Sequence, residues 1–345
     1  MLELIKNPGQ KIIMVTGGAG YVGSILLRRL LQEGYQVVCV DTLCYGGASL
    51  LDIWGNPNFV LEKIDITNQD AVNELFNRYS FHGIVHLAAI VGDPACKIEP
   101  ELARRTNLEA SKYLLESAVH SKVTRFVFAS TCSNYGKMKD PDKYVDERTP
   151  LAPVSLYAEL KVAFEEFILT KIPRDGICPT ILRFSTVYGI SPRMRFDLTV
   201  NEFSKEVALG RELLVFGEQF WRPYCHVSDF SQAILAVLKA DAETVAFDVF
   251  NVGDTSQNYT KKMLVEEILR QVPEARFSYV HKEDDPRDYR VNFDRIRDTL
   301  GFSITRSVPQ GIHEILTSIW SGIVKNPQDQ SYYNIPLLNT AREVI

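Results

Sequence analysis

The sequence predicts an α/β protein built on a doubly wound parallel sheet, with a smaller α/β lobe at its C-terminal end. Two observations lead to this fold class. In the first half, short apolar runs alternate with segments of helical spacing, and the runs lack the polar alternation of a half-exposed strand. After about residue 187 this alternation loosens and a loop rich in Pro and Arg appears. Buried strands that alternate with helices are typical of parallel sheets.

The expected elements follow one another along the chain. Strands are expected at 11–17, 36–41, 59–65, 83–89, 125–131 and 180–186, and helices at 21–34, 68–79, 100–120 and 155–171. Further helices are expected at 198–209, 228–240, 260–271 and 307–324, with short strands at 212–217 and 247–253. No linker is evident. We therefore expect a first domain at 1–186, segments near 222–255 that return to it, and a second lobe formed mainly by 187–345.

Composition excludes several classes of partner. The chain has 345 residues with 38 Lys and Arg against 43 Asp and Glu, and no basic block, so nucleic acid and anionic membranes are not expected. No apolar run reaches the ~18 residues of a membrane span, and the N-terminus does not resemble a leader peptide. The six cysteines form no CxxC or zinc-like pattern, which predicts reduced thiols in a cytoplasmic protein and no metal site.

A glycine-rich stretch, TGGAGYVG at 16–23, follows the first expected strand and opens the first expected helix. Its glycines permit a tight turn and a close approach to a pyrophosphate, which the N–H groups of the helix start can bind. Asp41 ends the next strand, where a carboxylate can accept hydrogen bonds from both hydroxyls of an adenosine ribose. The same carboxylate would repel a 2′-phosphate. The pattern therefore predicts a Rossmann-type site for NAD rather than NADP.

Two other segments carry candidate functional residues. Asp65 ends the third expected strand, where it could contact the adenine or simply lie at the start of a helix, and the residues alone leave both open. Tyr157 and Lys161 lie four positions apart and therefore on one face of a helix. A neighbouring ammonium favours the phenolate, so the pair could act as a base, although such spacing alone is more often a solvated helix face.

In order and spacing these segments resemble one family. The sequence is similar to the extended short-chain dehydrogenase/reductases, and more closely to the NAD-dependent nucleotide-sugar epimerases and dehydratases. The segments that carry the resemblance are TGGAGYVG, VDTLCYGG (40–47), DIT (65–67), HLAA (86–89), RTNLEAS (105–111), STCSNYG (130–136), SLYAELK (155–161), RPYCHVSD (222–229) and DPRDYR (285–290). The resemblance implies that NAD contacts Gly17, Gly20, Tyr21, Val22, Gly23, Asp41, Asp65, Ile66, Leu87, Ala88, Ala89, Asn107, Tyr157 and Lys161.

The segment STCSNYG contains the hydroxyl that the resemblance implies for catalysis. The catalytic Ser or Thr of the family lies four residues before the Tyr of the YG pair, which here is Thr131, and it acts with Tyr157 and Lys161. In the 4,6-dehydratases Asp and Glu follow this position, but Cys132 and Ser133 stand here, so dehydration is disfavoured. Cys132 is one position away from the catalytic Cys of some 3,5-epimerases. Because strand-end side chains alternate in direction, a structural thiol is favoured over a catalytic one.

The second lobe offers cations for a nucleoside diphosphate, including Arg193 and Arg195 of SPRMRFD. Many relatives carry an Asn where Thr186 stands, so the phosphate contacts could differ here. Asn201 could contact the nucleotide or pack a helix. The candidate substrate contacts are Thr131, Cys132, Ser133, Thr186, Arg195, Asn201, Arg222 and Arg287.

The resemblance implies hydride transfer at C4 of a nucleoside-diphosphate sugar, with NAD as cofactor. A C4 epimerase is the leading interpretation. The alternatives are a C4 dehydrogenase that releases a 4-keto sugar, with the stretches GISPRMRFDL and DPRDYRV similar to enzymes that oxidise GDP-heptoses, and a non-catalytic NAD-sensing protein. Helices 100–120 and 155–171 are expected to form a homodimer interface, as in the family.

Overall fold

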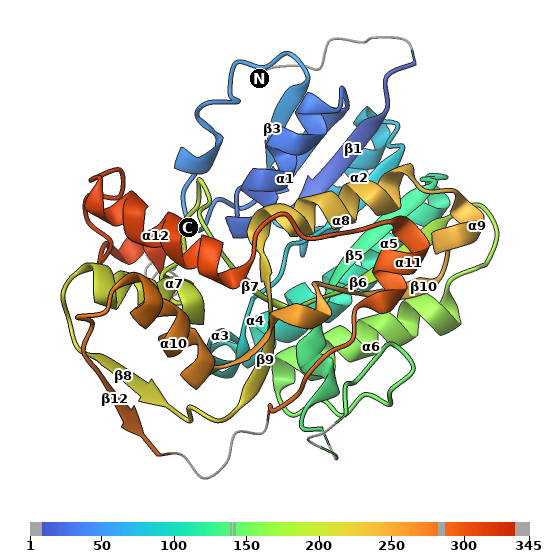
Figure 1. Cartoon of the computed structure of the whole chain (residues 1–345). Coiled ribbons are helices and arrows are strands. Elements are labelled where there is room, and N and C mark those ends of the chain that lie inside the picture. The colour runs from blue at the N-terminus through green and yellow to red at the C-terminus, as the bar shows by residue number, and fades with distance from the viewer. Residues whose placement is uncertain (1–8, 139, 141–142, 282–286, 335–345) are drawn as a thin grey trace.

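The computed structural model describes residues 9–138, 140, 143–281 and 287–334, so residues 1–8 of the N-terminus and positions 285–286 of DPRDYR lie outside the described part. A sheet of seven parallel strands forms the centre of the molecule (Figure 1). Its strands, in spatial order, are β10 (Asp248–Val252), β6 (Cys178–Phe184), β5 (Arg125–Thr131), β4 (Gly83–His86), β1 (Ile12–Thr16), β2 (Gln36–Asp41) and β3 (Phe59–Lys63). The order reverses direction between β1 and β4, which is where doubly wound sheets bind their ligands.

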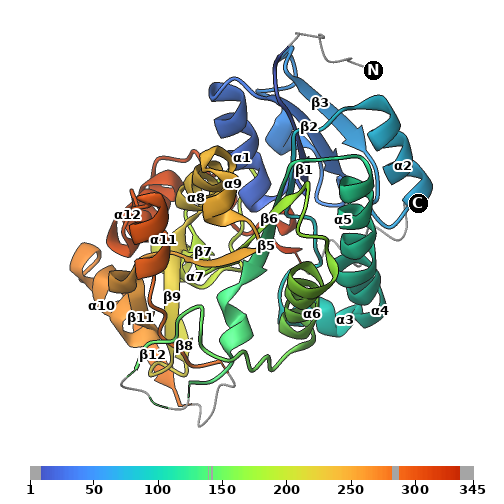
Figure 2. The same ribbon diagram turned by 90° about the vertical axis from the view of Figure 1, so that its right-hand side faces the viewer.

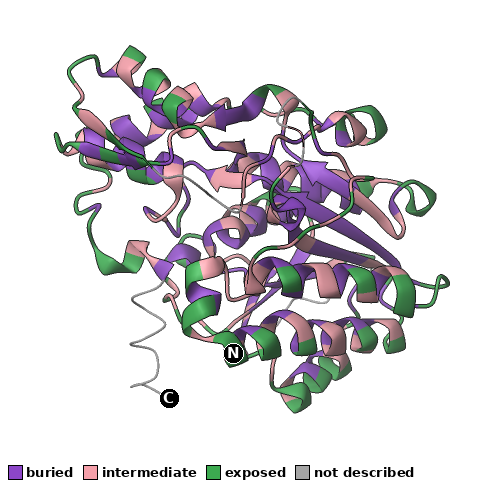
Figure 3. Cartoon of the chain, turned by 90° about the horizontal axis from the view of Figure 1, so that it is seen from below, coloured by how far each residue is buried: buried purple, intermediate pink, exposed green. Residues whose placement is uncertain are grey.

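Both faces of this sheet are buried, as the continuous apolar runs predict. In β1, Ile13 and Val15 belong to one core cluster and Met14 to another, because successive side chains point to opposite faces. Helices α1 (Tyr21–Gln32) and α8 (Val227–Lys239) pack together on the first face. Helices α2 (Gln69–Arg78), α5 (Ala110–His120) and α6 (Leu156–Lys171) cover the second (Figure 2). Figure 3 shows the strands buried between helices whose outer sides are exposed.

The second lobe has its own sheets and core. A three-stranded sheet pairs β11 (Asn258–Thr260), β9 (Trp221–His226) and β7 (Thr186–Tyr188), and a two-stranded sheet pairs β12 (Phe277–Val280) and β8 (Leu213–Phe216). Helices α7 (Thr199–Ala208), α10 (Lys261–Gln271) and α12 (Val308–Trp320) supply a third apolar cluster that contains Phe196, Ile268 and Ile312. The shorter helices are α3 (Asp93–Ile98), α4 (Pro100–Arg104), α9 (Ala242–Val245) and α11 (Asp294–Leu300).

Two expected elements are divided in the structure. The helix expected at 100–120 consists of α4, a π-helical turn at Arg105–Glu109 and α5. The strand expected at 180–186 is two strands, since β6 ends at Phe184 in the large sheet and β7 begins at Thr186 in the small one. Residues 222–255 were expected to return to the first domain. Of these, β10 is a strand of the large sheet and α8 packs against that sheet, whereas β9 belongs to the second lobe. The division of the chain at residue 186 stays a prediction.

Some apolar residues of the helices expected at the dimer interface are buried inside the subunit. Leu115 of α5 and Phe164 of α6 are fully buried against their own sheet, so neither can contact a second subunit. Leu108 and Phe167 are only partly buried. In the part of the chain that the structure describes, no helix is both long and apolar enough to cross a membrane.

Candidate functional site

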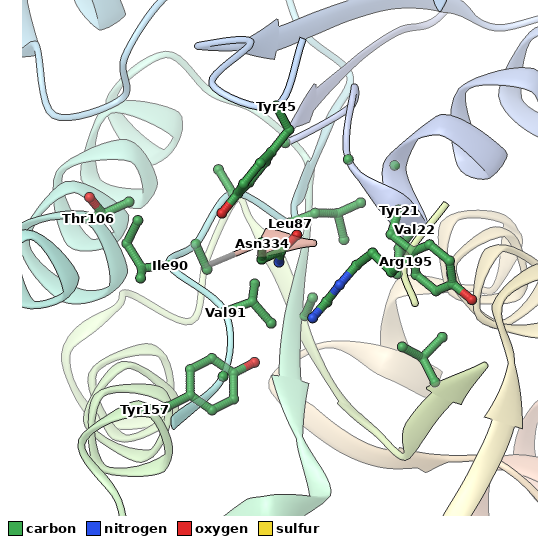
Figure 4. A pocket seen from close by; sticks show the side chains of 18 of the residues that line it. Tyr21, Val22, Tyr45, Leu87, Ile90, Val91, Thr106, Tyr157, Arg195 and Asn334 are labelled. Carbon is green, nitrogen blue, oxygen red and sulfur yellow. The ribbon is translucent and has the colours of Figure 1, made fainter. Parts of the chain in front are cut away.

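A cavity of about 1210 Å³ lies between the carboxyl ends of the large sheet and the second lobe. Figure 4 shows side chains from both lobes around it, among them Tyr45, Tyr157 and Arg195. The residues proposed from the sequence that line it are Gly17, Gly20, Tyr21, Val22, Gly23, Asp41, Asp65, Ile66, Leu87, Ala88, Ala89, Thr131, Ser133, Tyr157, Lys161, Thr186, Arg195, Arg222 and Arg287. Three proposed residues, Asn107, Cys132 and Asn201, do not line it.

The glycine-rich turn has the geometry that a pyrophosphate requires. Gly17 has a φ of +71°, and a Cβ there would lie 2.8 Å from the backbone nitrogen of Ala88. A Cβ at Gly23 would collide with the carbonyl oxygen of Gly17, so helix α1 can pack this closely only with Gly at that position. Gly20 is the N-cap of α1 and has no side chain to bond the first N–H groups of the helix. These groups are therefore left for an anion.

The carboxylate of Asp41 is fixed at the end of β2. Its two oxygens accept hydrogen bonds from the backbone nitrogens of Ala19, at 3.0 Å, and Leu43, at 2.8 Å. Burial raises the pKa of this carboxyl above its ordinary value, and the two backbone donors oppose the shift. Both oxygens keep further lone pairs. The residues present thus fit a dinucleotide with a free ribose, and Asp41 would hold that ribose.

Replacing Asp41 with Ala is expected to weaken NAD binding by ~10–100-fold, because hydrogen bonds to a charged group are lost. Discrimination against NADP should relax, since the charge that repels a 2′-phosphate is removed. Calorimetric titration with NAD and NADP would measure both effects. Asp52→Ala is a suitable control, because Asp52 is an exposed partner of Arg28 outside the cavity. Tighter binding of NADP than of NAD by the unmodified protein would contradict the role of Asp41.

The loop after β4 completes this side of the cavity. His86 is buried between the hydroxyls of Thr16 and Ser111, each 2.8 Å from a ring nitrogen, and its pKa is lowered by burial to about 3, so it is neutral. Asn107 was expected to contact the cofactor. Its amide instead accepts from the nitrogen of Ile90, at 2.8 Å, and donates to the carbonyl oxygen of the same residue, at 2.9 Å. Asn107 therefore fixes the backbone of the loop after β4 and does not itself line the cavity.

Asp65 and Ile66 line the cavity beyond the end of β3. One carboxylate oxygen of Asp65 accepts from the nitrogen of Thr67 at 2.8 Å, and Asn68, not Asp65, is the N-cap of α2. Asp65 therefore lies just before α2 without capping it, and the structural alternative stays open. A contact between Asp65 and the adenine stays a prediction.

Tyr157 and Lys161 lie on the first turns of α6 and both line the cavity. Lys161 lies 5.8 Å from the centroid of the Tyr157 ring, and its ammonium donates to the carbonyl oxygen of Ala129 at 2.7 Å. Burial raises the pKa of Tyr157, and the charge of Asp93 adds to this effect. Proximity of Lys161 alone therefore does not make Tyr157 a base at neutral pH.

The buried ammonium of Lys161 makes a testable contribution to the pH dependence of stability. Burial lowers its pKa to about 8, from 10.5 in an unfolded chain. Between these values the unfolded state binds more protons, so the free energy of unfolding rises with pH. Relative to a Lys161→Met variant, the wild type should gain about 3 kcal/mol between pH 8 and pH 10.5. Urea unfolding of both proteins across this range would measure the gain. A constant difference would show that Lys161 does not titrate there.

Thr131 is the last residue of β5, and its side chain caps the short helix Cys132–Tyr135. Its hydroxyl oxygen accepts from the nitrogen of Ser133 at 3.1 Å, and both residues line the cavity. Cys132 points the other way. Its thiol is fully buried and donates to the carbonyl oxygen of Arg183 at 3.2 Å, and burial raises its pKa. The inclusion of Cys132 among the substrate contacts is therefore wrong, and the strand-end alternation explains why.

A buried ion pair beneath Thr131 was not foreseen from the sequence. Arg183 of β6 donates to Glu165 of α6, with 2.7 Å between Nη2 and Oε2, and both side chains are almost fully buried. Ser130 and Asn134 donate to the same carboxylate. Ser130 thus bonds a side chain of the neighbouring helix α6. This network fixes the backbone that carries Thr131. Glu165 follows Lys161 by one helical turn, which is the signal that could have identified it.

The second lobe supplies four of the proposed substrate contacts. Thr186 and Arg195 line the cavity, and Arg195 is paired with Asp197 at 2.7 Å. The guanidinium of Arg222 lies over the ring of Tyr289. Arg287 forms an ion pair with Asp93 of α3 at 2.9 Å, which joins the two lobes across the cavity.

Asn201 is fully buried and does not face the cavity. Its side-chain oxygen accepts from the nitrogen of Gly189 at 2.9 Å, and its amide donates to the carbonyl oxygen of Arg195 at 2.8 Å. The expectation that Asn201 contacts the nucleotide is therefore wrong. Asn201 braces the loop that carries Arg193 and Arg195, and its packing role is the alternative that the sequence had left open.

Comparisons with known proteins identify the family of the chain. A family model described as the NAD dependent epimerase/dehydratase family matches residues 13–253. A dTDP-glucose 4,6-dehydratase of Streptomyces niveus is 30% identical over 92% of this chain and 96% of its own length. A UDP-glucuronate 4-epimerase of Thermodesulfobacterium geofontis is 30% identical over 79% of this chain and 84% of its own.

A solved structure shows the same fold. It is a UDP-glucuronic acid 4-epimerase from Bacillus cereus in complex with UDP-glucuronic acid and NAD, with a TM-score of 0.79 and 24% identity over 90% of this chain and 99% of that one. The family match covers most of the chain and includes the glycine-rich turn, Asp41, Thr131, Tyr157 and Lys161. The chain belongs to the NAD-dependent epimerase/dehydratase family, whose enzymes use NAD as their cofactor.

Proposed function

We propose that the protein is a nucleotide-sugar enzyme that transfers hydride at C4 of the sugar, and that it acts as a C4 epimerase. One observation carries this proposal. Thr131, Tyr157 and Lys161 line the same cavity as the glycine-rich turn and Asp41. A proton-transfer group and a dinucleotide site therefore open onto one space, as oxidation of an alcohol requires.

The residues would divide the chemistry as follows. Bound NAD supplies the hydride acceptor. Tyr157 takes the proton of the C4 hydroxyl, and the hydroxyl of Thr131 bridges the two oxygens. The ammonium of Lys161 donates a hydrogen bond to β5. It would place a positive charge next to Tyr157 and could donate to the hydroxyls of the cofactor ribose. In an epimerase, Tyr157 would then give this proton back to the C4 oxygen when the rotated 4-keto sugar is reduced from its other face.

Two features favour this reaction over dehydration. The residues after Thr131 are Cys132, which faces the core, and Ser133, which cannot replace a carboxylic acid. Neither can expel water from the sugar, although the Streptomyces niveus relative is named a dehydratase.

The substrate class follows from the second lobe and from the relatives. Arg195, Arg222 and Arg287 line the cavity, two of them already paired with Asp197 and Asp93, and their guanidinium groups can donate to the oxygens of a diphosphate. The cavity of about 1210 Å³ exceeds the ~300–1,000 Å³ of a single-ligand site, so a cofactor and a substrate can both be held. The relatives named above are enzymes of dTDP-glucose and UDP-glucuronate.

A substrate panel tests the proposal. The protein would be incubated with NAD and UDP-, GDP-, CDP- or dTDP-sugars, and the products would be separated by chromatography and weighed by mass spectrometry. An epimer of unchanged mass supports the proposal. A released product two mass units lighter would instead identify a C4 dehydrogenase. Loss of water would identify a dehydratase, and no turnover of any sugar, with NAD bound, would favour an NAD-sensing protein.

We also propose that the protein works in the cytoplasm as a homodimer. The partly exposed residues Leu108 and Phe167 on the helices of the second sheet face would contribute to the interface between subunits. Light scattering at micromolar concentration tests the assembly, and a strict monomer would contradict it.

A further inference from the structure

Arg193 is a buried cation whose hydrogen-bonding capacity is mostly unused. Only 6% of the residue is exposed, yet it lines the cavity. Within the described part of the chain, its Nε and Nη2 have no hydrogen-bond partner, and Nη1 makes only a long contact of 3.3 Å to the carbonyl oxygen of Met194. An unpaired buried charge is strongly unfavourable, so such a group calls for an anion.

The neighbouring groups do not supply this anion. The nearest carboxylate along the loop, Asp197, already bonds both Nε and Nη2 of Arg195, at 3.0 and 2.7 Å. The guanidinium of Arg193 instead lies 4.5 Å from the ring centroid of Tyr45. Burial, and then repulsion by Arg195, lower the pKa of Arg193. The surrounding protein groups therefore stabilise the charged guanidinium of Arg193 poorly.

The position of Arg193 indicates which anion it serves. Its loop is tied to the first turn of α1, because the hydroxyl of Ser191 donates to the carbonyl oxygen of Tyr21 at 2.7 Å and lies 3.0 Å from the hydroxyl of Ser24. Tyr45 belongs to the loop after Asp41, and its side chain projects into the cavity (Figure 4). Arg193 thus belongs to a loop bonded to the first turn of α1, and its guanidinium faces the loop that follows Asp41.

We propose that Arg193 is a cofactor-binding residue contributed by the second lobe, and that its Nε and Nη2 donate to the pyrophosphate of NAD. This inference rests on the cofactor site proposed above. Nε and Nη2 form one edge of the guanidinium, so they can bond two phosphate oxygens at once. The glycine-rich turn holds the pyrophosphate from the first lobe and Arg193 holds it from the second. The other source of the same chemistry is the diphosphate of the sugar nucleotide, and the experiment separates the two.

The test compares Arg193→Met and Arg193→Lys with the wild type and with Arg174→Met. Arg174 is a matched control, because its guanidinium also lies over an aromatic ring, that of Phe247, but outside the cavity. Calorimetry would give the affinities of the cofactor-free proteins for NAD and for UDP, GDP, CDP and dTDP. We expect Arg193→Met to bind NAD ~10–100-fold more weakly and the nucleoside diphosphates unchanged. Arg193→Lys should lie between the two, and Arg174→Met should match the wild type.

Thermal unfolding adds a second readout. Without NAD, Arg193→Met should melt no lower than the wild type, because it removes an unpaired buried charge. With NAD, it should gain less stability than the wild type. Unchanged NAD affinity, whether or not nucleoside diphosphate binding falls, would overturn the inference, and so would a lower melting temperature without NAD as the sole effect. If Arg193→Met does not fold, Arg193→Lys decides by the same measurements. A wild type that binds no NAD would instead refute the proposed function.

Discussion

Replacing Tyr157 with Phe is expected to reduce C4 oxidation by ~10²–10⁴-fold, which is the usual effect of removing a general base. The change deletes one hydroxyl that lines the cavity and leaves the ring in place. NAD binding should change little, because the glycine-rich turn and Asp41 lie elsewhere on the cavity wall. Single-turnover formation of NADH with an accepted nucleotide sugar would measure the loss.

The control for this variant is Tyr113→Phe. The hydroxyl of Tyr113 on α5 donates to Asn73 at 2.8 Å, outside the cavity, so its loss should leave oxidation intact. Thr131→Val should also slow oxidation, whereas Thr131→Ser should retain much of it, since only the former removes the bridging hydroxyl. Rapid oxidation by the Tyr157→Phe variant would show that another group takes the proton.

Replacing Glu165 with Ala is expected to lower the free energy of unfolding by ~3–5 kcal/mol, because it leaves Arg183 charged and buried without its partner. The pair is almost inaccessible to water, and Ser130 and Asn134 would lose their acceptor as well. Denaturant unfolding followed by circular dichroism would measure the change.

An exposed ion pair provides the comparison. Glu33 contacts Lys239 at the surface, where such pairs contribute ~0–1 kcal/mol, so Glu33→Ala should have a small effect. If Glu165→Ala were as mild as Glu33→Ala, water or a shifted side chain would be satisfying Arg183. The position of Thr131 would then not depend on this network.

The sequence was sufficient for those features that depend on local spacing. Continuous apolar runs predicted a parallel sheet that is buried on both faces, and the residues of the glycine-rich turn and Asp41 line one cavity as expected. The catalytic hydroxyls were placed by resemblance, and all of them open onto that cavity. Their roles stay predictions until variants are measured.

Features that depend on contacts between distant segments could not be predicted. The pairing of Glu165 with Arg183 joins α6 to β6, and neither residue marks the other in the sequence. The resemblance implied a cofactor contact for Asn107, and the sequence left a nucleotide contact open for Asn201, but both side chains bond backbone groups of loops. The Nε and Nη2 of Arg193 lack a partner because Asp197 pairs with Arg195 instead. This arrangement can be seen only from the side-chain geometry.

Tyr21, from the glycine-rich turn, is also anchored in the opposite lobe. Its hydroxyl donates to the carbonyl oxygen of Gly189 at 2.5 Å and accepts from the amide of Asn201 at 3.1 Å. A chimaera that keeps the first 186 residues and takes the remainder from a relative would break this junction unless the donor also carries a suitable amide and turn. Recombination of such enzymes should therefore retain Gly189 and Asn201 together with Tyr21, so that the contact between the two lobes is kept.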